Sequence, residues 1–383
     1  MVDNVITRIF GITGGRAAYY LPSGPEIIHY PFRKRARRHP NINHQRNERY
    51  SSKPPALLVS KLRKETNASL SKIIQALTAS DNSIPSALEW LAKDALASGT
   101  AKAAKSDRIA AEGVVYSILN PTLTRGRGGI RGVLLEVNSE TDFAARGPLF
   151  QQFVQRAAVT GLMLGESLVG AHHFGGRKSL HALPVDKLLH APSFPPPPSF
   201  KSNSDSIPSS IEQPLKDHLS TLIGTIGERV TLRRAHIALP PPRISTSDSL
   251  TIVSNYVHTL PDVPEMGRMG AMVVMHARDA ANNTGNIDAS TIPDIESLGR
   301  KIAQHVTGFN PSSVWALDGA NDETVLMKQE FLCGGGTVEK VLNDFQGLKG
   351  VKLEIADFVR YECAEGIEKV EANFAEEVQK QLQ

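Results

Sequence analysis

The chain has 383 residues, of which 40% are hydrophobic and 21% charged, a length that suits two or three domains with a core each. No apolar run approaches the about 18 to 20 residues that span a bilayer, so no membrane anchor is predicted. The net charge of +4 is uneven, because residues 1–53 contain ten Lys or Arg and three Asp or Glu, which leaves −3 for the remainder. A mildly acidic body argues against a nucleic-acid surface there.

The basic head, residues 1–53, is rich in Arg and poor in acid, as organelle transit peptides are. We predict a mitochondrial presequence, and with it a location in the matrix. Asp3 and the lack of a clean apolar helical face count against this interpretation. A basic tail for nucleic-acid binding or nuclear import is the alternative.

Residues 54–108 follow a helical pattern. A first short helix is expected around Leu57 to Leu62, and a second from Leu70 to Leu77, where apolar residues recur at i, i+3, i+4 and i+7. A third should begin near Pro85 and end just before Gly99, with a separate linker helix over 99–113. Three helices of this length form a small module that usually binds a partner.

A first core half is predicted over residues 109–236. The strand 114–120, a glycine-rich turn and the strand 133–137 read as a β-hairpin, and a helix follows from Leu149 to Leu162. The run 191–214, rich in Pro and Ser, should form a surface insertion. In 228–239 the apolar alternation slips by one across Arg233 and Arg234, which indicates a β-bulge.

The second half, residues 237–383, carries another hairpin with strands at 251–257 and 270–277 and His258 at the edge of its loop. A helix around Leu298 to Val306, a strand over 358–363 and a closing helix over 370–378 follow. Helices and hairpins interleave without βαβ regularity. The predicted fold class is therefore α+β, with a core of two α+β halves and antiparallel sheets.

Motifs for covalent chemistry or cofactor binding are missing from the sequence. The glycines of RGRGGIRG (125–132) lack the GxxxxGK[ST] pattern and read as a hairpin turn. No HExxH or GxSxG occurs, so no metal, cofactor or catalytic residue is predicted. Cys333 and Cys363 fit no metal or disulfide spacing and are interpreted as two buried free thiols. The histidines are interpreted as loop residues: His172, His173, His181 and His190.

Asp142 and Phe143 stand at the tip of the first hairpin, where a loop would ordinarily be polar. Two interpretations carry equal weight. In one, Phe143 returns to the core and Asp142 caps the helix that begins near Pro148. In the other, both side chains project as a wedge into a partner, because aromatic anchors carry much of an interface's energy.

Several segments, in the same order along the chain, resemble the elongation factor Ts family, most closely its mitochondrial type. They are LLVSKLRKETNASLSKIIQAL (57–77), ALEWLAKDALASGTAKAAK (87–105), AAEGVV (110–115), LLEVNSETDF (134–143), IGERVTLRR (226–234) and VRYECAEGIEKVEANFAEEV (359–378). The resemblance implies a ubiquitin-associated-like three-helix module ahead of the two halves. It also implies a nucleotide-exchange factor, which binds elongation factor Tu and speeds GDP release without binding nucleotide itself.

The resemblance also implies contact residues. Asp142 and Phe143 would enter the G domain of elongation factor Tu near its magnesium, and His258 would meet the third domain. The remaining implied contacts are Arg63 to the G domain, Ile226 and Gly227 to one of its helices, and the basic pair Arg300 and Lys301. The chain has no room for the coiled-coil insertion of bacterial forms, which implies a one-to-one complex with mitochondrial elongation factor Tu.

Two departures from the family pattern bear on these contacts. Ser69, Leu70 and Ser71 stand where many relatives have Gly-Met-Met, and a longer loop is expected after His258. Two other functions remain open on the sequence. One is a binding module whose helices recognise ubiquitin-like or nascent-chain partners, and the other is RNA binding by the basic head, which would depend steeply on salt.

Overall fold

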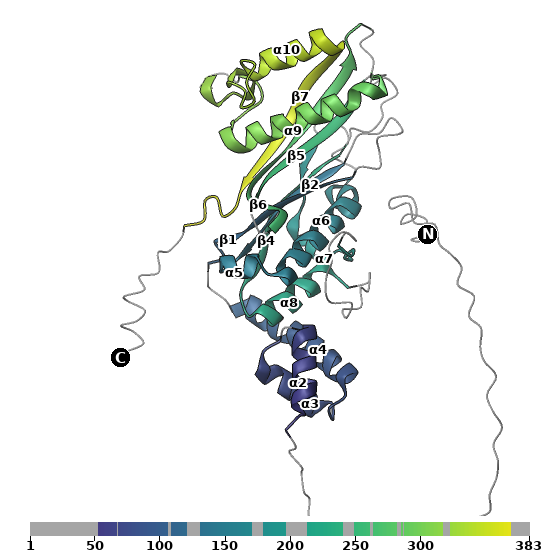
Figure 1. The fold of residues 1–383 in the computed structure, drawn as a ribbon, viewed down its shortest axis with the longest axis vertical. Helices are drawn as coiled ribbons and strands as arrows, with labels where there is room; N and C mark the ends of the chain where they lie inside the picture. The colour runs from purple at the N-terminus through teal and green to yellow at the C-terminus, as the bar shows by residue number, and fades with distance from the viewer. Residues whose placement is uncertain are drawn as a thin grey trace, which may run out of the picture. The chain divides into compact units, whose positions relative to one another are not determined.

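The structure is a computed structural model, shown in Figure 1. It describes residues 53–66, 68–105, 109–120, 131–170, 179–196, 213–239, 249–260, 263–281, 285, 287–316 and 322–368. The chain divides into residues 1–53 and 54–383, and every element below belongs to the second unit. The predicted presequence, the glycine-rich turn, the middle of the Pro/Ser-rich insertion, His172, His173 and the closing helix lie outside the described residues.

Three helices open this unit, as the sequence predicts: α2 (Ala56–Thr66), α3 (Leu70–Ala79) and α4 (Ile84–Lys105). The side chain of Ser69 caps α3 by accepting a hydrogen bond from the backbone N–H of Lys72. A small core forms where the helices meet, from Leu62, Ile73, Ala76, Leu77, Ala87 and Leu91.

The predicted end of the third helix at Gly99 is wrong, since α4 continues to Lys105. Gly99 is instead a contact point with α8 (Leu215–Ile226): a Cβ there would lie 1.7 Å from the carbonyl oxygen of Ser220. Gly224 on α8 is equally constrained, because its Cβ would lie 1.9 Å from the carbonyl oxygen of Ala95. The two glycines let the helix backbones touch, so α4 packs directly on the first core half.

Within the part of the chain that the structure describes, one antiparallel sheet of seven strands forms the centre, in the order β3-β4-β2-β1-β6-β5, with β7 also paired to β6. The long strand β6 joins the two halves, because it pairs with β1 at Val115↔Gly267 and with β7 over its residues 269–279. Helices plus antiparallel strands confirm the α+β fold class. The strands are β1 (Glu112–Leu119), β2 (Gly132–Ser139), β3 (Leu180–Ala182), β4 (Val230–Ala238), β5 (Leu250–Leu260), β6 (Val263–Asp279) and β7 (Val351–Glu362).

Helices cover the sheet, and Figure 1 shows α9 (Ile292–Phe309) and α10 (Val338–Lys349) over the strands of the second half. The first half carries α5 (Asp142–Ala145), α6 (Pro148–Val169), α7 (Val185–His190) and α8. Short 3-10 turns lie at Ala289–Thr291, Asp322–Thr324 and Leu326–Lys328. Within the described residues, no helix is long and apolar enough to cross a membrane.

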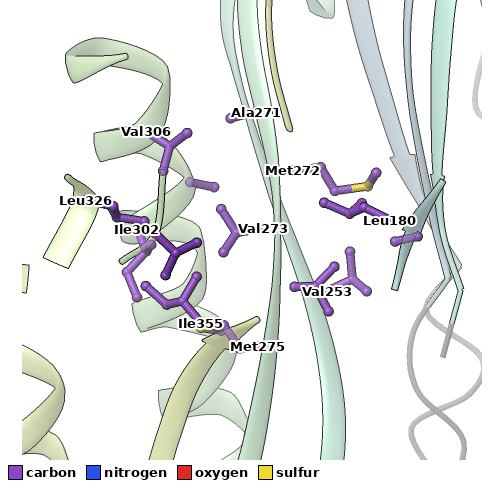
Figure 2. Close-up of a cluster of buried hydrophobic side chains, with 14 of the residues drawn as sticks. Leu180, Val253, Ala271, Met272, Val273, Met275, Ile302, Val306, Leu326 and Ile355 are labelled. Carbon is purple, nitrogen blue, oxygen red and sulfur yellow. The ribbon is translucent and has the colours of Figure 1, made fainter. Parts of the chain in front are cut away.

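The second-half core lies on both faces of its strands, as Figure 2 shows. Val273 points to the side of α9, toward Ile302 and Val306, whereas Met272 and Val253 point to the opposite side, toward Leu180. Because successive side chains alternate between the faces of a strand, this burial on both sides requires a nearly continuous apolar run in β6. Residues 271–275, AMVVM, are all fully buried.

Both hairpins predicted from the sequence are present, but the strands of the second are longer than predicted. β1 and β2 pair as predicted, and the expected bulge is confirmed opposite Glu136 and Val137. The long loop expected after His258 is wrong, since β5 runs to Leu260 and β6 begins at Val263. Register shifts keep this extension paired, and Gly267, whose Cβ would lie 1.8 Å from the carbonyl oxygen of His258, permits the close approach.

Candidate partner-binding site

Phe143 lies on the short helix α5 and is 87% exposed. Its neighbours Ala144 and Ala145 are buried, so the same turn points the Phe143 ring away from the core. The interpretation that Phe143 returns to the core is therefore wrong. Asp142 does not cap the following helix either, because Gly147 stands at the N-cap of α6 and the Asp142 carboxylate accepts a hydrogen bond of 2.9 Å from Arg146 Nε.

Hydrogen bonds tie this tip to the turn between α8 and β4. The Glu228 carboxylate accepts from the backbone N–H of Thr141 at 3.1 Å and from its hydroxyl at 2.9 Å. In return, Glu140 Oε1 accepts from the backbone N–H of Arg229 at 2.7 Å. Residues 140 and 141 are thus joined to residues 229 and 228, which lie almost 90 positions later in the chain.

Ile226 and Gly227 directly precede this pair of bonds. Ile226 is the last residue of α8, and Gly227 turns the chain out of the helix with φ +83°, in the left-handed region that favours glycine. Gly227 is exposed and Ile226 half-buried. The structure therefore brings four predicted contact residues together: Asp142, Phe143, Ile226 and Gly227.

A basic side chain of β6 interacts electrostatically with Asp142 of the tip. Arg268 forms an ion pair with Glu112 on β1. Burial acts to lower the pKa of Arg268, but its hydrogen bond to Glu112 and the negative charges around it, including that of Asp142, raise the pKa overall. The charge of Asp142 thus acts on a cation of the second half, while its hydrogen bond goes to Arg146.

His258, Arg300 and Lys301 form a second group, on β5 and α9. His258 is exposed and pairs with Met269 across the hairpin. Tyr256 stands two residues earlier on the same face of β5, and the Arg300 guanidinium lies 5.7 Å from the centre of its ring. Lys301 is exposed beside Arg300 on α9.

Arg63 lies on a different element from both groups. It is exposed on α2, a helix that packs against α3 and α4. Among the described residues, no hydrogen bond or ion pair joins Arg63 to the other predicted contact residues.

Sequence reasoning missed a buried charge cluster around Glu136 on β2. Glu136 has no exposed surface and accepts from Arg233 at 3.0 Å, Arg234 at 2.6 Å and the backbone N–H of Ala364 at 2.7 Å. The bulge on β4 lets two consecutive arginines reach one carboxylate. The signal was available as an acid inside the apolar strand LLEVN together with the double arginine at the predicted bulge.

The cluster also connects the two halves. Arg234 donates to the carbonyl oxygen of Glu362 at 2.9 Å, and its guanidinium lies 4.1 Å from the ring centre of Tyr361 on β7. Cys363 next to them is buried, and burial raises the pKa of its thiol to about 12. Cys333, by contrast, is exposed, so the interpretation of two buried thiols is wrong for one of them.

Two features stand out on the surface: an exposed aromatic on a braced tip and an exposed cationic group on the neighbouring half. Within the described residues, no group of three or more His, Cys, Asp or Glu is placed to hold a metal ion. The arrangement offers contact and charge to another molecule, since exposed aromatic and Arg side chains are the usual anchors of protein interfaces.

Comparison with known proteins identifies the family. The family described as Elongation factor TS matches residues 140–318, which include the tip and the second group. Elongation factor Ts of Rhodospirillum centenum is 29% identical over 363 residues, covering 84% of this chain and 97% of that protein. Mitochondrial elongation factor Ts is 31% identical in Coprinopsis cinerea, over 82% of this chain and 93% of that protein, and 30% identical in Xenopus laevis, over 82% and 88%. The chain belongs to the elongation factor Ts family.

Proposed function

We propose that this protein is the guanine-nucleotide exchange factor for mitochondrial elongation factor Tu, binding it one to one in the matrix during translation elongation. Membership of the family supports the exchange activity, and relatives named as mitochondrial, together with the basic head, support the location. The single observation that carries the proposal is the braced tip, on which Phe143 is 87% exposed.

Exchange follows from linkage between two binding equilibria. If the protein binds nucleotide-free elongation factor Tu more tightly than the GDP-bound form, it must weaken GDP binding by the same coupling free energy. A coupling of about 4 kcal/mol corresponds to roughly a thousandfold in affinity. This chain breaks and forms no covalent bond in the process.

The two groups of contact residues have different roles in this proposal. Phe143 and Asp142 enter the G domain near its magnesium, with Ile226 and Gly227 against an adjoining helix, and Arg63 adds a contact from α2. His258 meets the third domain, and Arg300 and Lys301 lie beside it. Distortion of the phosphate-binding region by the first group lowers the affinity for GDP, while the second group holds the complex together.

The same proposal assigns the segments of the chain. Residues 1–53 act as the presequence, 54–108 as the ubiquitin-associated-like module, 109–236 as the first core half with its insertion at 191–214, and 237–383 as the second core half. The location and the exchange activity are separable, because the presequence takes no part in exchange.

The direct test measures release of a fluorescent GDP analogue from purified mitochondrial elongation factor Tu. The full chain and a form beginning at Pro54 should accelerate release equally. No acceleration by either form would reject the exchange function and favour a binding module for ubiquitin-like or nascent-chain partners. Acceleration that requires residues 1–53 and falls steeply with salt would favour a nucleic-acid-binding head.

A further inference from the structure

We infer that Glu228 is a positioning residue, which holds Thr141 so that Phe143 and Asp142 are presented in one orientation. This inference rests on the proposed function. It concerns a residue outside the contact set, since Glu228 acts through Thr141 and the tip rather than by touching the nucleotide site.

The bonds of Thr141 form a relay from Glu228 to α5. The Thr141 hydroxyl donates to the Glu228 carboxylate at 2.9 Å and accepts from the backbone N–H of Ala144 at 3.2 Å. A hydroxyl has one hydrogen to donate, so the carboxylate orients it and leaves a lone pair for the first turn of α5. Thr141 is the N-cap of this helix.

α5 needs such a support because it has only four residues. A helix of this length cannot form stably by itself, since nucleation fixes several dihedral angles for a single hydrogen bond. Burial of Ala144 and Ala145 anchors one side of the turn, but the Phe143 ring gains nothing from the core. The direction of the Phe143 ring is therefore set by the N-cap residue Thr141 and by the Glu228 carboxylate that holds it.

Two further bonds restrict the tip from the other side. The Ser139 hydroxyl donates to the carbonyl oxygen of Thr141 at 2.9 Å, and Glu140 accepts from the Arg229 N–H. Because Glu228 directly follows Gly227, a partner that presses on this turn acts on the residue that holds Thr141. Contact at Gly227 and entry of Phe143 are thereby coupled in one rigid unit.

The test compares Glu228→Ala and Thr141→Val with Thr141→Ser, which retains the hydroxyl. Glu339→Ala is the control, because Glu339 is a half-exposed carboxylate on α10 whose nearest cation, Lys328, is 3.9 Å away. In the partner-free protein, hydrogen exchange of residues 140–147 should become about tenfold faster in the first two variants and remain unchanged in the others.

The same variants are then measured in the GDP-release assay. Glu228→Ala and Thr141→Val should reduce the maximal release rate by about tenfold to a hundredfold, the scale on which misplacement acts. The half-saturating concentration should stay within about threefold, because the contact residues themselves are intact. Thr141→Ser and Glu339→Ala should behave as the unmodified chain.

Three results would overturn the inference: unchanged hydrogen exchange at the tip, faster hydrogen exchange with an unchanged release rate, or a loss in affinity with the maximal rate intact. If the unmodified protein does not accelerate release at all, the proposed function fails. Hydrogen exchange then still decides whether Glu228 orders the tip.

Discussion

Arg234 Nε donates a 2.6 Å hydrogen bond to the carboxylate of Glu136, and that carboxylate has no exposed surface. Arg233, the side-chain amide of Asn138 and the Ala364 N–H also donate to this carboxylate, so its negative charge is well compensated. Removing one partner of such a pair destabilises a protein by more than the intact pair stabilises it, because the other charge is left buried without a counterion. The pair fixes the end of β7 against β2, six residues before the wedge.

Glu136→Ala should destabilise the protein by about 3 kcal/mol, the low end for breaking a buried pair, because two half-buried arginines lose the carboxylate between them while Arg234 keeps its 3.1 Å ion pair with Glu365. Unfolding in urea followed by circular dichroism measures the change. Glu136→Gln, which keeps the shape and one acceptor, should cost less. A loss for Glu136→Ala no larger than that for the surface change Glu339→Ala, within about 0.5 kcal/mol of zero, would show that the cluster is not structural.

Gly224→Ala should separate α4 from α8, since the new Cβ would lie 1.9 Å from a backbone oxygen that cannot move aside alone. We expect a loss of about 1 to 3 kcal/mol, the usual cost of overpacking. The thermal midpoint is the measurement, and Gly347→Ala on α10 is the matched control because it has open space around it. The control should be neutral or stabilising by about 0.5 to 1 kcal/mol, and equal behaviour of the two variants would contradict the contact.

The free energy of unfolding should decrease at low pH because of His218 on α8. Burial first, and the charge of Arg156 second, lower the pKa of His218 to about 4, below the usual 6.5. The unfolded chain therefore takes up a proton at a higher pH than the folded one, so stability is lost as pH falls from about 6.5 to 4. His218→Gln should flatten the curve of unfolding free energy against pH by about 1 to 2 kcal/mol over that range, after allowance for partial exposure.

His276 and His305 act in the same direction, because burial lowers the pKa of each. Some pH dependence should therefore remain in the His218 variant. A variant whose unfolding free energy falls as steeply as that of the unmodified chain would show that His218 is not protonated on unfolding.

Local patterns in the sequence were sufficient for much of the fold. The i, i+3, i+4 spacing of α3 reflects burial of one face and the apolar run in β2 reflects burial of both faces, and each element is present. The bulge was predictable too, because a one-residue slip in alternation at Arg233 can be accommodated only by an extra residue in the strand.

Features that depend on distant partners could not be predicted. Gly99 looked like a helix end, yet its role is set by Ser220, which lies more than a hundred residues later. The role of Glu136 likewise depends on distant residues, the arginines of β4 and Ala364 just after β7, which surround its carboxylate in the fold. The Phe143 ambiguity was resolved only by the orientation of Ala144 and Ala145, whose burial turns the ring outward.

The central claim is that the exposed Phe143 ring drives exchange, and it is tested most directly by the rate of GDP-analogue release from mitochondrial elongation factor Tu. Phe143→Ala should fold with an unchanged thermal midpoint, because the ring is 87% exposed, yet lose most of the acceleration. Leu348→Ala, at an apolar side chain on α10 that is 79% exposed, should accelerate release like the unmodified protein. Full acceleration by Phe143→Ala would contradict the account.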